Sequence, residues 1–94
     1  SRRKIVPTVI QKNMCEDFWV WKDVFDRDDI TRSEHGISQS TIYQSGEEPN
    51  TCYVVMQIES ISKLHSYNEK FLSTGKSIEA GIITSENTVC HDVT

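Results

Sequence analysis

His35, His91 and Arg32 are the side chains of this sequence best suited to chemistry in a pocket. His35 could act as a general base because histidine titrates near neutral pH. Arg32 could neutralise a ligand carboxylate at a pocket rim through its bidentate guanidinium. His91 alternates with Val89 and Val93, so it could project a polar group into a pocket or an interface. Each also has a purely structural interpretation. His35 could be a solvated loop residue, His91 could make a structural hydrogen bond, and Arg32 could pair with neighbouring acidic residues.

Bulky apolar residues recur at a spacing that could give such a pocket its wall. Trp21 and Phe25 lie on one stripe of an expected helix, Phe71 lies on a second, and Tyr43 and Met56 belong to expected strands. Aromatic residues at helical spacing more often fill a core. If they face the short serine and threonine residues of the second strand, the core leaves a void of ~300 Å³ or larger that suits a small ligand.

No motif for a metal, a phosphate group or covalent catalysis accompanies these residues. The three cysteines and three histidines never approach a zinc-like spacing, and the acidic run at residues 26–29 lacks the rest of a calcium loop. A glycine-rich phosphate loop, a GxSxG elbow and a HExxH helix are all missing. We therefore assign no catalytic residue and expect neither a metal nor another cofactor.

Length and composition indicate one small domain that spans residues 1–94. A net charge of −4, with no face that gathers the basic residues, excludes nucleic acid as a partner. No apolar run is long enough to cross a bilayer, and no secretory signal is present. The odd set Cys15, Cys52 and Cys90 contains no CxxC pair, which favours reduced thiols and a cytoplasmic protein.

The hydrophobic period changes along the chain in the order βαββαβ, which predicts an α+β, ferredoxin-like domain. Strand patterns cover residues 5–12, 37–45, 51–59 and 88–93, and helical patterns cover residues 16–26 and 60–72. We expect a turn at residues 13–15, a hairpin loop at 46–50, and connections at 26–36 and 73–79. Pairing of the first strand should begin at or after Pro7, and Gly36 and Gly75 should adopt positive φ.

This element order predicts a four-stranded antiparallel sheet with both helices on one face. Strands one and three carry apolar residues on both of their faces. Whichever face of the sheet the helices cover, the other face keeps Tyr or Val of strand three and Val or Ile of strand one exposed to water. The simplest cover is a second copy of the chain, packed face to face over an area on the order of 1,600 Å² or more. A homodimer is therefore expected.

Several scattered residues match a known pattern in this order of elements. They are Asp17, Trp21, Phe25, Arg32 and Gly36, then Tyr43, Pro49 and Asn50, then Ser73, Ala80, Gly81 and Ile82. On these residues the chain resembles the dimeric α/β-barrel superfamily of ferredoxin-like proteins, of the antibiotic-biosynthesis-monooxygenase type, and most of all its small uncharacterised members.

The resemblance implies a cavity between the sheet and the helices of each subunit. In that superfamily this cavity serves cofactor-free oxygenation, haem degradation, dismutation, isomerisation or simple ligand binding. Haem-binding members use a pocket histidine, which none of His35, His65 and His91 matches. The oxygenases use Asn, Trp and His groups in the pocket, of which this chain supplies Trp21.

Three functions compete on this basis. The preferred one is a homodimer with an apolar pocket in each subunit for a small apolar or amphipathic molecule. Its wall would be Trp21, Phe25, Tyr43, Met56 and Phe71, and its polar groups Arg32, His35 and His91. The first alternative is a cofactor-free monooxygenase or isomerase, which a buried His or Tyr beside the void with a displaced pKa would favour. The second is a non-catalytic interaction protein with a fully packed core.

Overall fold

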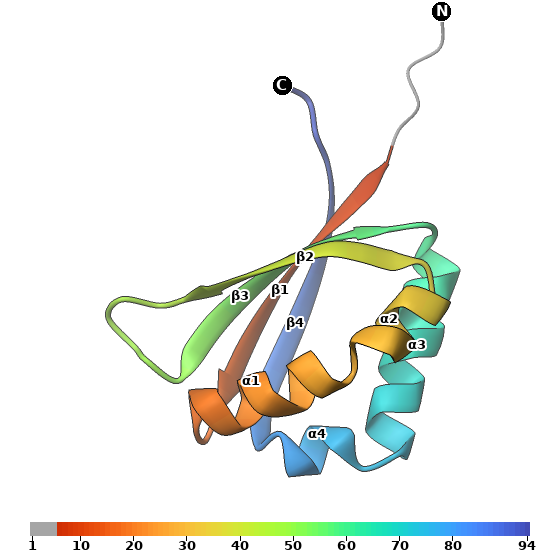
Figure 1. Ribbon diagram of the computed structural model, residues 1–94. Coiled ribbons are helices and arrows are strands. Elements are labelled where there is room, and N and C mark those ends of the chain that lie inside the picture. Colours follow the sequence, from red (N-terminus) through yellow and green to blue (C-terminus); the bar gives the residue numbers. More distant parts are fainter. Residues whose placement is uncertain (1–5) are drawn as a thin grey trace, which may run out of the picture.

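The predicted order of strands and helices is present, with two short helices added (Figure 1). A computed structural model describes residues 6–94, so the predicted strand start at Ile5 lies outside the described residues. The elements are β1 (Pro7–Cys15), α1 (Phe18–Arg27), α2 (Asp29–Glu34), β2 (Ile37–Gln44), β3 (Thr51–Ile58), α3 (Ile61–Ser73), α4 (Lys76–Glu79) and β4 (Ile82–His91).

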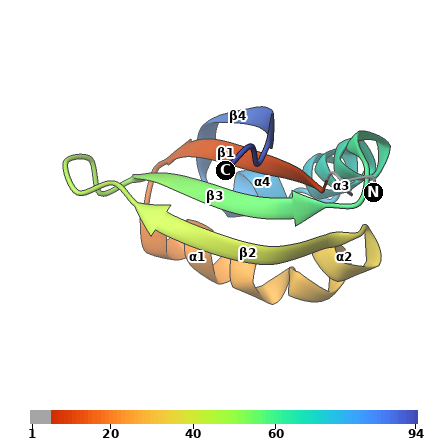
Figure 2. The same ribbon diagram turned by 90° about the horizontal axis from the view of Figure 1, so that it is seen from above.

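The strands of residues 6–94 form one antiparallel sheet in the order β2-β3-β1-β4 (Figure 2). β1 is central, between β3 and β4, and its pairing begins at Pro7 opposite His91. A proline is tolerated there because it starts the strand, as predicted. The helices all cover one face of the sheet (Figure 1). The domain is thus α+β and ferredoxin-like, which confirms the predicted fold class.

Two strand boundaries were predicted wrongly. β1 continues through the expected turn to Cys15, because Met14 pairs with both Thr51 of β3 and Thr84 of β4. β4 begins at Ile82, six residues before the predicted stretch at residues 88–93. After Ile82 and Ile83 its residues 84–88 are all polar and show no alternation, so their strand conformation comes from pairing with β1.

Both long connections contain a short helix where loops were expected. α2 occupies part of residues 26–36, and α4 part of residues 73–79. Gly36 (φ 68°) and Gly75 (φ 76°) have the predicted left-handed conformation, so each can turn the chain without a Cβ clash. No helix in residues 6–94 is long and apolar enough to cross a membrane.

The core lies between the helices and one face of the sheet. Phe18, Trp21 and Phe25 of α1 stack in series, with ring centroids 5.8 and 5.0 Å apart. β3 supplies Cys52, Val54, Met56 and Ile58, and α3 supplies Leu64 and Tyr67. Trp19 is 66% exposed and points away from the core. Ile61 at the start of α3 is half exposed, and Leu64 and Tyr67 form the buried stripe of that helix.

No helix of residues 6–94 covers the opposite face of the sheet, which we call the open face. The cross-strand pairs Ile10 with Val55, Lys12 with Tyr53, and Tyr43 with Tyr53 place these side chains on it. Its exposed large hydrophobic residues are Ile10, Met14, Tyr43 and Tyr53. The open face therefore has an apolar centre, as the sequence predicted, but it also carries polar side chains such as Lys12 and Glu86.

Candidate ligand-binding cavity

A cavity of about 190 Å³ lies between the inner face of the sheet and helices α1, α3 and α4. Its lining residues are Gln11, Asn13, Trp21, Phe25, Met56, Tyr67, Asn68, Phe71, Leu72, Ser77, Ile82, Ser85 and Asn87. It is smaller than the predicted void because Tyr67, which the sequence analysis did not place in the core, packs into this layer. An apolar cavity of ~150 Å³ can hold a benzene molecule, so this one is the size of a single ring system.

The apolar wall of the cavity consists largely of residues that were predicted to line a pocket. Trp21 and Phe25 come from α1, Met56 from β3 and Phe71 from α3. Strand alternation brings Met56 to the inner face, and the helical spacing of Trp21 and Phe25 turns both rings toward it. Half of the predicted pocket residues thus meet at one cavity.

The sheet side of the cavity carries a chain of three amides. Asn13 Nδ2 donates to Gln11 Oε1 (2.9 Å), and Gln11 Nε2 donates to Asn87 Oδ1 (2.9 Å) across the β1–β4 pair. Asn13 is 1% exposed, and no group in residues 6–94 donates to its Oδ1. A buried amide oxygen left without a donor costs about 1–3 kcal/mol, so such atoms are rare in native proteins.

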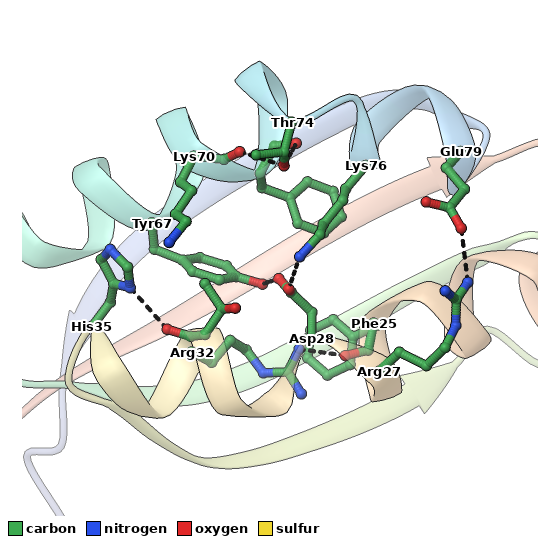
Figure 3. A network of polar contacts seen from close by, with 12 residues as sticks. Phe25, Arg27, Asp28, Arg32, His35, Tyr67, Lys70, Thr74, Lys76 and Glu79 are labelled. Carbon is green, nitrogen blue, oxygen red and sulfur yellow. Dashed lines mark hydrogen bonds and ion pairs between the residues drawn. The ribbon is translucent and has the colours of Figure 1, made fainter.

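Tyr67 connects the cavity to a buried polar cluster at the junction of α1 and α2 (Figure 3). Its hydroxyl donates to Asp28 Oδ2 (2.5 Å), and Lys76 of α4 forms an ion pair with the other carboxylate oxygen. Asp28 is 2% exposed. Burial by itself would raise the pKa of Asp28, but the hydrogen bonds from Lys76 and Tyr67 prevail and lower it. The carboxylate therefore stays ionised and joins three helical segments.

The same contacts determine the protonation of Tyr67. Burial, followed by the hydrogen bond to the Asp28 carboxylate, raises the pKa of its phenol. Tyr67 therefore keeps its proton at neutral pH, and that proton is directed at Asp28 rather than at the cavity. Tyr67 is a neutral part of the wall and is unsuited to act as a general base.

Arg32 and His35 were predicted as polar groups of the pocket, but neither lines this cavity. The Arg32 guanidinium lies 3.6 Å from the centre of the Phe25 ring and donates to the Phe25 carbonyl oxygen (2.5 Å). His35 Nδ1 lies 2.8 Å from the Thr31 carbonyl oxygen. Both belong to the α2 segment, which folds as a helix rather than as a loop over the cavity. Arg32 instead packs against the ring of Phe25, which is a residue of the cavity wall (Figure 3).

Tyr43 and His91 also lie away from the cavity. Tyr43 is 57% exposed on the open face, because strand alternation in β2 turns it away from the helices. His91 is the last residue of β4 and is exposed. It pairs with Pro7, whereas the cavity reaches only Asn87 along that strand. Four of the eight residues predicted to line the pocket therefore lie outside the cavity, namely Arg32, His35, Tyr43 and His91.

Sequence reasoning missed the polar side of the cavity. Gln11 was assigned to a strand face without a role, Asn13 was placed in a turn, and Asn87 preceded the expected last strand. One usable signal was present: Gln11 and Asn13 are two residues apart, so an uninterrupted strand puts both amides on the face of Val9. Tyr67 follows Leu64 by three residues, which is the helical spacing that could have identified it.

The buried cysteines and the acidic residues offer no second reactive centre. Cys15 and Cys52 are unpaired, and burial raises the pKa of both thiols, to about 12 for Cys52. They are therefore protonated and poor nucleophiles at neutral pH. Within residues 6–94, no three His, Cys, Asp or Glu side chains are grouped so that they could hold a metal ion.

Comparison with known proteins rests on structure. No family model and no curated protein sequence matches the chain. Among solved structures, SnoaB, a cofactor-independent oxygenase from Streptomyces nogalater, matches with a TM-score of 0.75 at 14% identity over 97% of this chain and 96% of its own. The chain therefore has the same ferredoxin-like fold as this oxygenase.

Two further structures support this assignment. PA3566 from Pseudomonas aeruginosa matches over 100% of both chains, with a TM-score of 0.70 and 15% identity. A dimeric ferredoxin-like protein from an uncultured marine organism matches over 97% of this chain and 90% of its own, with a TM-score of 0.61 and 10% identity. At these identities the likeness shows the fold, which confirms the resemblance inferred from the sequence.

Proposed function

We propose that this protein is a homodimer that binds one small, predominantly apolar molecule in the inner cavity of each subunit. The observation that carries the proposal is the cavity itself, about 190 Å³ with a wall of Trp21, Phe25, Met56 and Phe71. It opens to solvent beside the exposed residues Leu72, Ser85 and Asn87. An aromatic-walled void with a few polar groups at one side is typical of ligand sites.

Dimerisation through the open face is the second half of the proposal. Ile10 and Val55 lie at the centre of this face on the two middle strands, with Tyr43 and Tyr53 beside them. A solvent-facing sheet of a monomer is normally polar. A second copy would bury these residues in an interface of at least ~800 Å² per subunit, the size of a standard stable complex. A neighbour of the same fold is described as dimeric, which supports a homodimer.

Ligand binding is tested by filling the cavity from α4. Ser77 lines the cavity, so Ser77→Trp should occupy the space and weaken binding of small ring molecules at least tenfold. Isothermal titration calorimetry with indole, benzofuran and toluene would measure this. Ser62→Trp makes the same change on the exposed surface of α3 and should leave the affinities unaltered. The pocket is refuted if none of the three molecules binds the natural protein or if Ser77→Trp binds them equally well.

Cofactor-free catalysis is a second candidate because Tyr67 is a buried tyrosine with a displaced pKa at the cavity wall. The direction of that displacement favours a binder, since the phenol retains its proton. We expect no oxygen uptake when the protein is mixed with a bound ring molecule in an oxygen electrode. Uptake that falls at least tenfold in Tyr67→Phe, with ligand affinity unchanged, would establish the oxygenase instead.

A further inference from the structure

Tyr67 of α3 separates the cavity from the buried cluster around Asp28. Its ring lines the cavity and its hydroxyl donates to Asp28 Oδ2 (2.5 Å), whereas Asp28 itself is not a lining residue. Both side chains are buried, with 6% of Tyr67 and 2% of Asp28 exposed. The phenol therefore fills the space between the cavity and an ionised carboxylate (Figure 3).

The Tyr67 side chain is held both at its ring and at its hydroxyl. The ring packs against His35 and Phe71, with ring centroids 5.9 and 6.1 Å away. The carboxylate that accepts the hydrogen bond is fixed in turn by its ion pair with Lys76 of α4. A ligand could move the ring aside only by giving up this packing and leaving a buried hydroxyl without an acceptor. Tyr67 is thus a fixed wall of the cavity rather than a lid.

The mouth of the cavity lies between α3 and β4. Leu72 of α3 and Ser85 and Asn87 of β4 line the cavity and are exposed. The space between this mouth and the Tyr67 wall, about 190 Å³, is enough for a single ring system. A longer molecule has to project through the mouth into water, where its added apolar surface gains little.

We propose that Tyr67 determines the length of the ligand. Its phenol occupies the inner part of what would otherwise be a longer pocket reaching Asp28, and it thereby restricts the cavity to molecules with a single ring system. This inference rests on the proposed binding function and adds the residue that sets its specificity. The ligand ring lies against Trp21, Phe25 and Phe71, on the cavity side of Tyr67.

Ligand length is tested with phenol and 4-phenylphenol, which carries a second ring in line with the first. We define the length ratio as the affinity of 4-phenylphenol divided by that of phenol, both measured by isothermal titration calorimetry. In the natural protein it should stay below about ten, because the second ring remains at the mouth. In Tyr67→Ala it should rise at least tenfold, because a second ring can take the place of the phenol. Tyr67→Phe keeps the ring and should keep the natural length ratio.

The chemistry of the vacated space provides a second readout, which a purely structural role of Tyr67 would not change. Phenol and toluene have nearly the same shape, but only phenol can donate to Asp28 Oδ2 as Tyr67 does. The hydroxyl ratio, the affinity of phenol divided by that of toluene, should rise at least tenfold from the natural protein to Tyr67→Ala. Phe71→Ala removes a different ring of the cavity wall and should leave the hydroxyl ratio unaltered.

The outcomes separate this inference from the function on which it rests. A natural length ratio above ten, a length or hydroxyl ratio that does not rise in Tyr67→Ala, or an equal rise of the length ratio in Tyr67→Phe would overturn the role of Tyr67 and leave the pocket standing. Failure of phenol, toluene and indole alike to bind the natural protein would refute the pocket. Rises of both ratios in Tyr67→Ala, absent from the two control variants, would support both.

Circular dichroism verifies that each variant folds. If Tyr67→Ala does not fold, Tyr67→Leu keeps part of the packing and should shift both ratios in the same direction. The length ratio of the natural protein needs no substitution, so it tests the inference even if neither variant folds.

Discussion

Replacement of Asp28 by alanine should lower the free energy of unfolding at pH 7 by about 1.5–3 kcal/mol, because the buried Tyr67 hydroxyl loses a charged acceptor and the partly exposed Lys76 loses its partner. That loss is a large share of the roughly 5–15 kcal/mol that holds a typical domain together. Urea unfolding followed by circular dichroism would measure it.

The control for Asp28 is an aspartate in an exposed pair. Asp23→Ala removes the partner of Arg27 on the surface of α1 and should cost less than about 1 kcal/mol. Tyr67→Phe removes a single hydrogen bond to a charged group and should cost about 1.5–3 kcal/mol. If Asp28→Ala proves no more destabilising than Asp23→Ala, the buried cluster does not stabilise the fold.

The Asp28 cluster also has a defined pH dependence. The pKa of Asp28 is lowered in the folded protein, so its contribution to stability is complete above the unfolded value of about 3.9. The contribution is lost as the pH falls from there through the folded pKa. In Asp28→Asn this part of the acid destabilisation should be absent, whereas Asp23→Asn should follow the natural protein.

Val55→Lys should convert the proposed dimer into a folded monomer. Val55 lies on the central strand β3 of the open face, opposite Ile10 and Thr41 on its neighbours. A two-fold contact through this face would bury a new ammonium group of each subunit in its apolar centre, beside Ile10. Burying a charge in an apolar contact costs several kcal/mol, so the dissociation constant should rise at least a hundredfold.

Sedimentation equilibrium would measure this change in subunit association. Ile30→Lys places the same charge on the exposed side of α2 and should leave association unaltered. Circular dichroism would verify that the Val55→Lys monomer keeps its helices and strands. Either a natural protein that is monomeric at micromolar concentration or a Val55→Lys variant that stays dimeric would rule out the open face as the interface.

The proposed ligand site and the proposed dimer interface lie on opposite faces of the sheet, so the two can be tested independently. The cavity is lined by residues that face the helices, such as Gln11 and Met56, whereas Ile10 and Val55 face the opposite way on the same strands. A change on one face therefore alters association and a change on the other alters binding. Coupling between the two would have to pass through the strands themselves.

Local periodicity was enough to predict the element order, the hairpin and most of the apolar wall. The alternation of Cys52, Val54, Met56 and Ile58 and the helical spacing of Trp21 and Phe25 report directly which side chains are buried. The same patterns indicated that the sheet is apolar on both faces. These features depend on neighbours a few residues apart, so they can be read from a single chain.

Contacts between segments far apart in the sequence decided the features that local patterns did not predict. Asn13 belongs to a strand because β3 and β4 bind the backbone on both sides of it, and Asn87 reaches the cavity only because β4 pairs with β1 at that register. Asp28, Tyr67 and Lys76 come from separate segments and meet only when the helices pack. A polar residue carries no local signal of whether it will be buried, since its burial depends on partners far away in sequence. Most of the apolar wall was therefore determined by the sequence pattern, whereas the exclusion of Tyr43, the entry of Tyr67 and the polar chemistry of the site were decided by the packed structure.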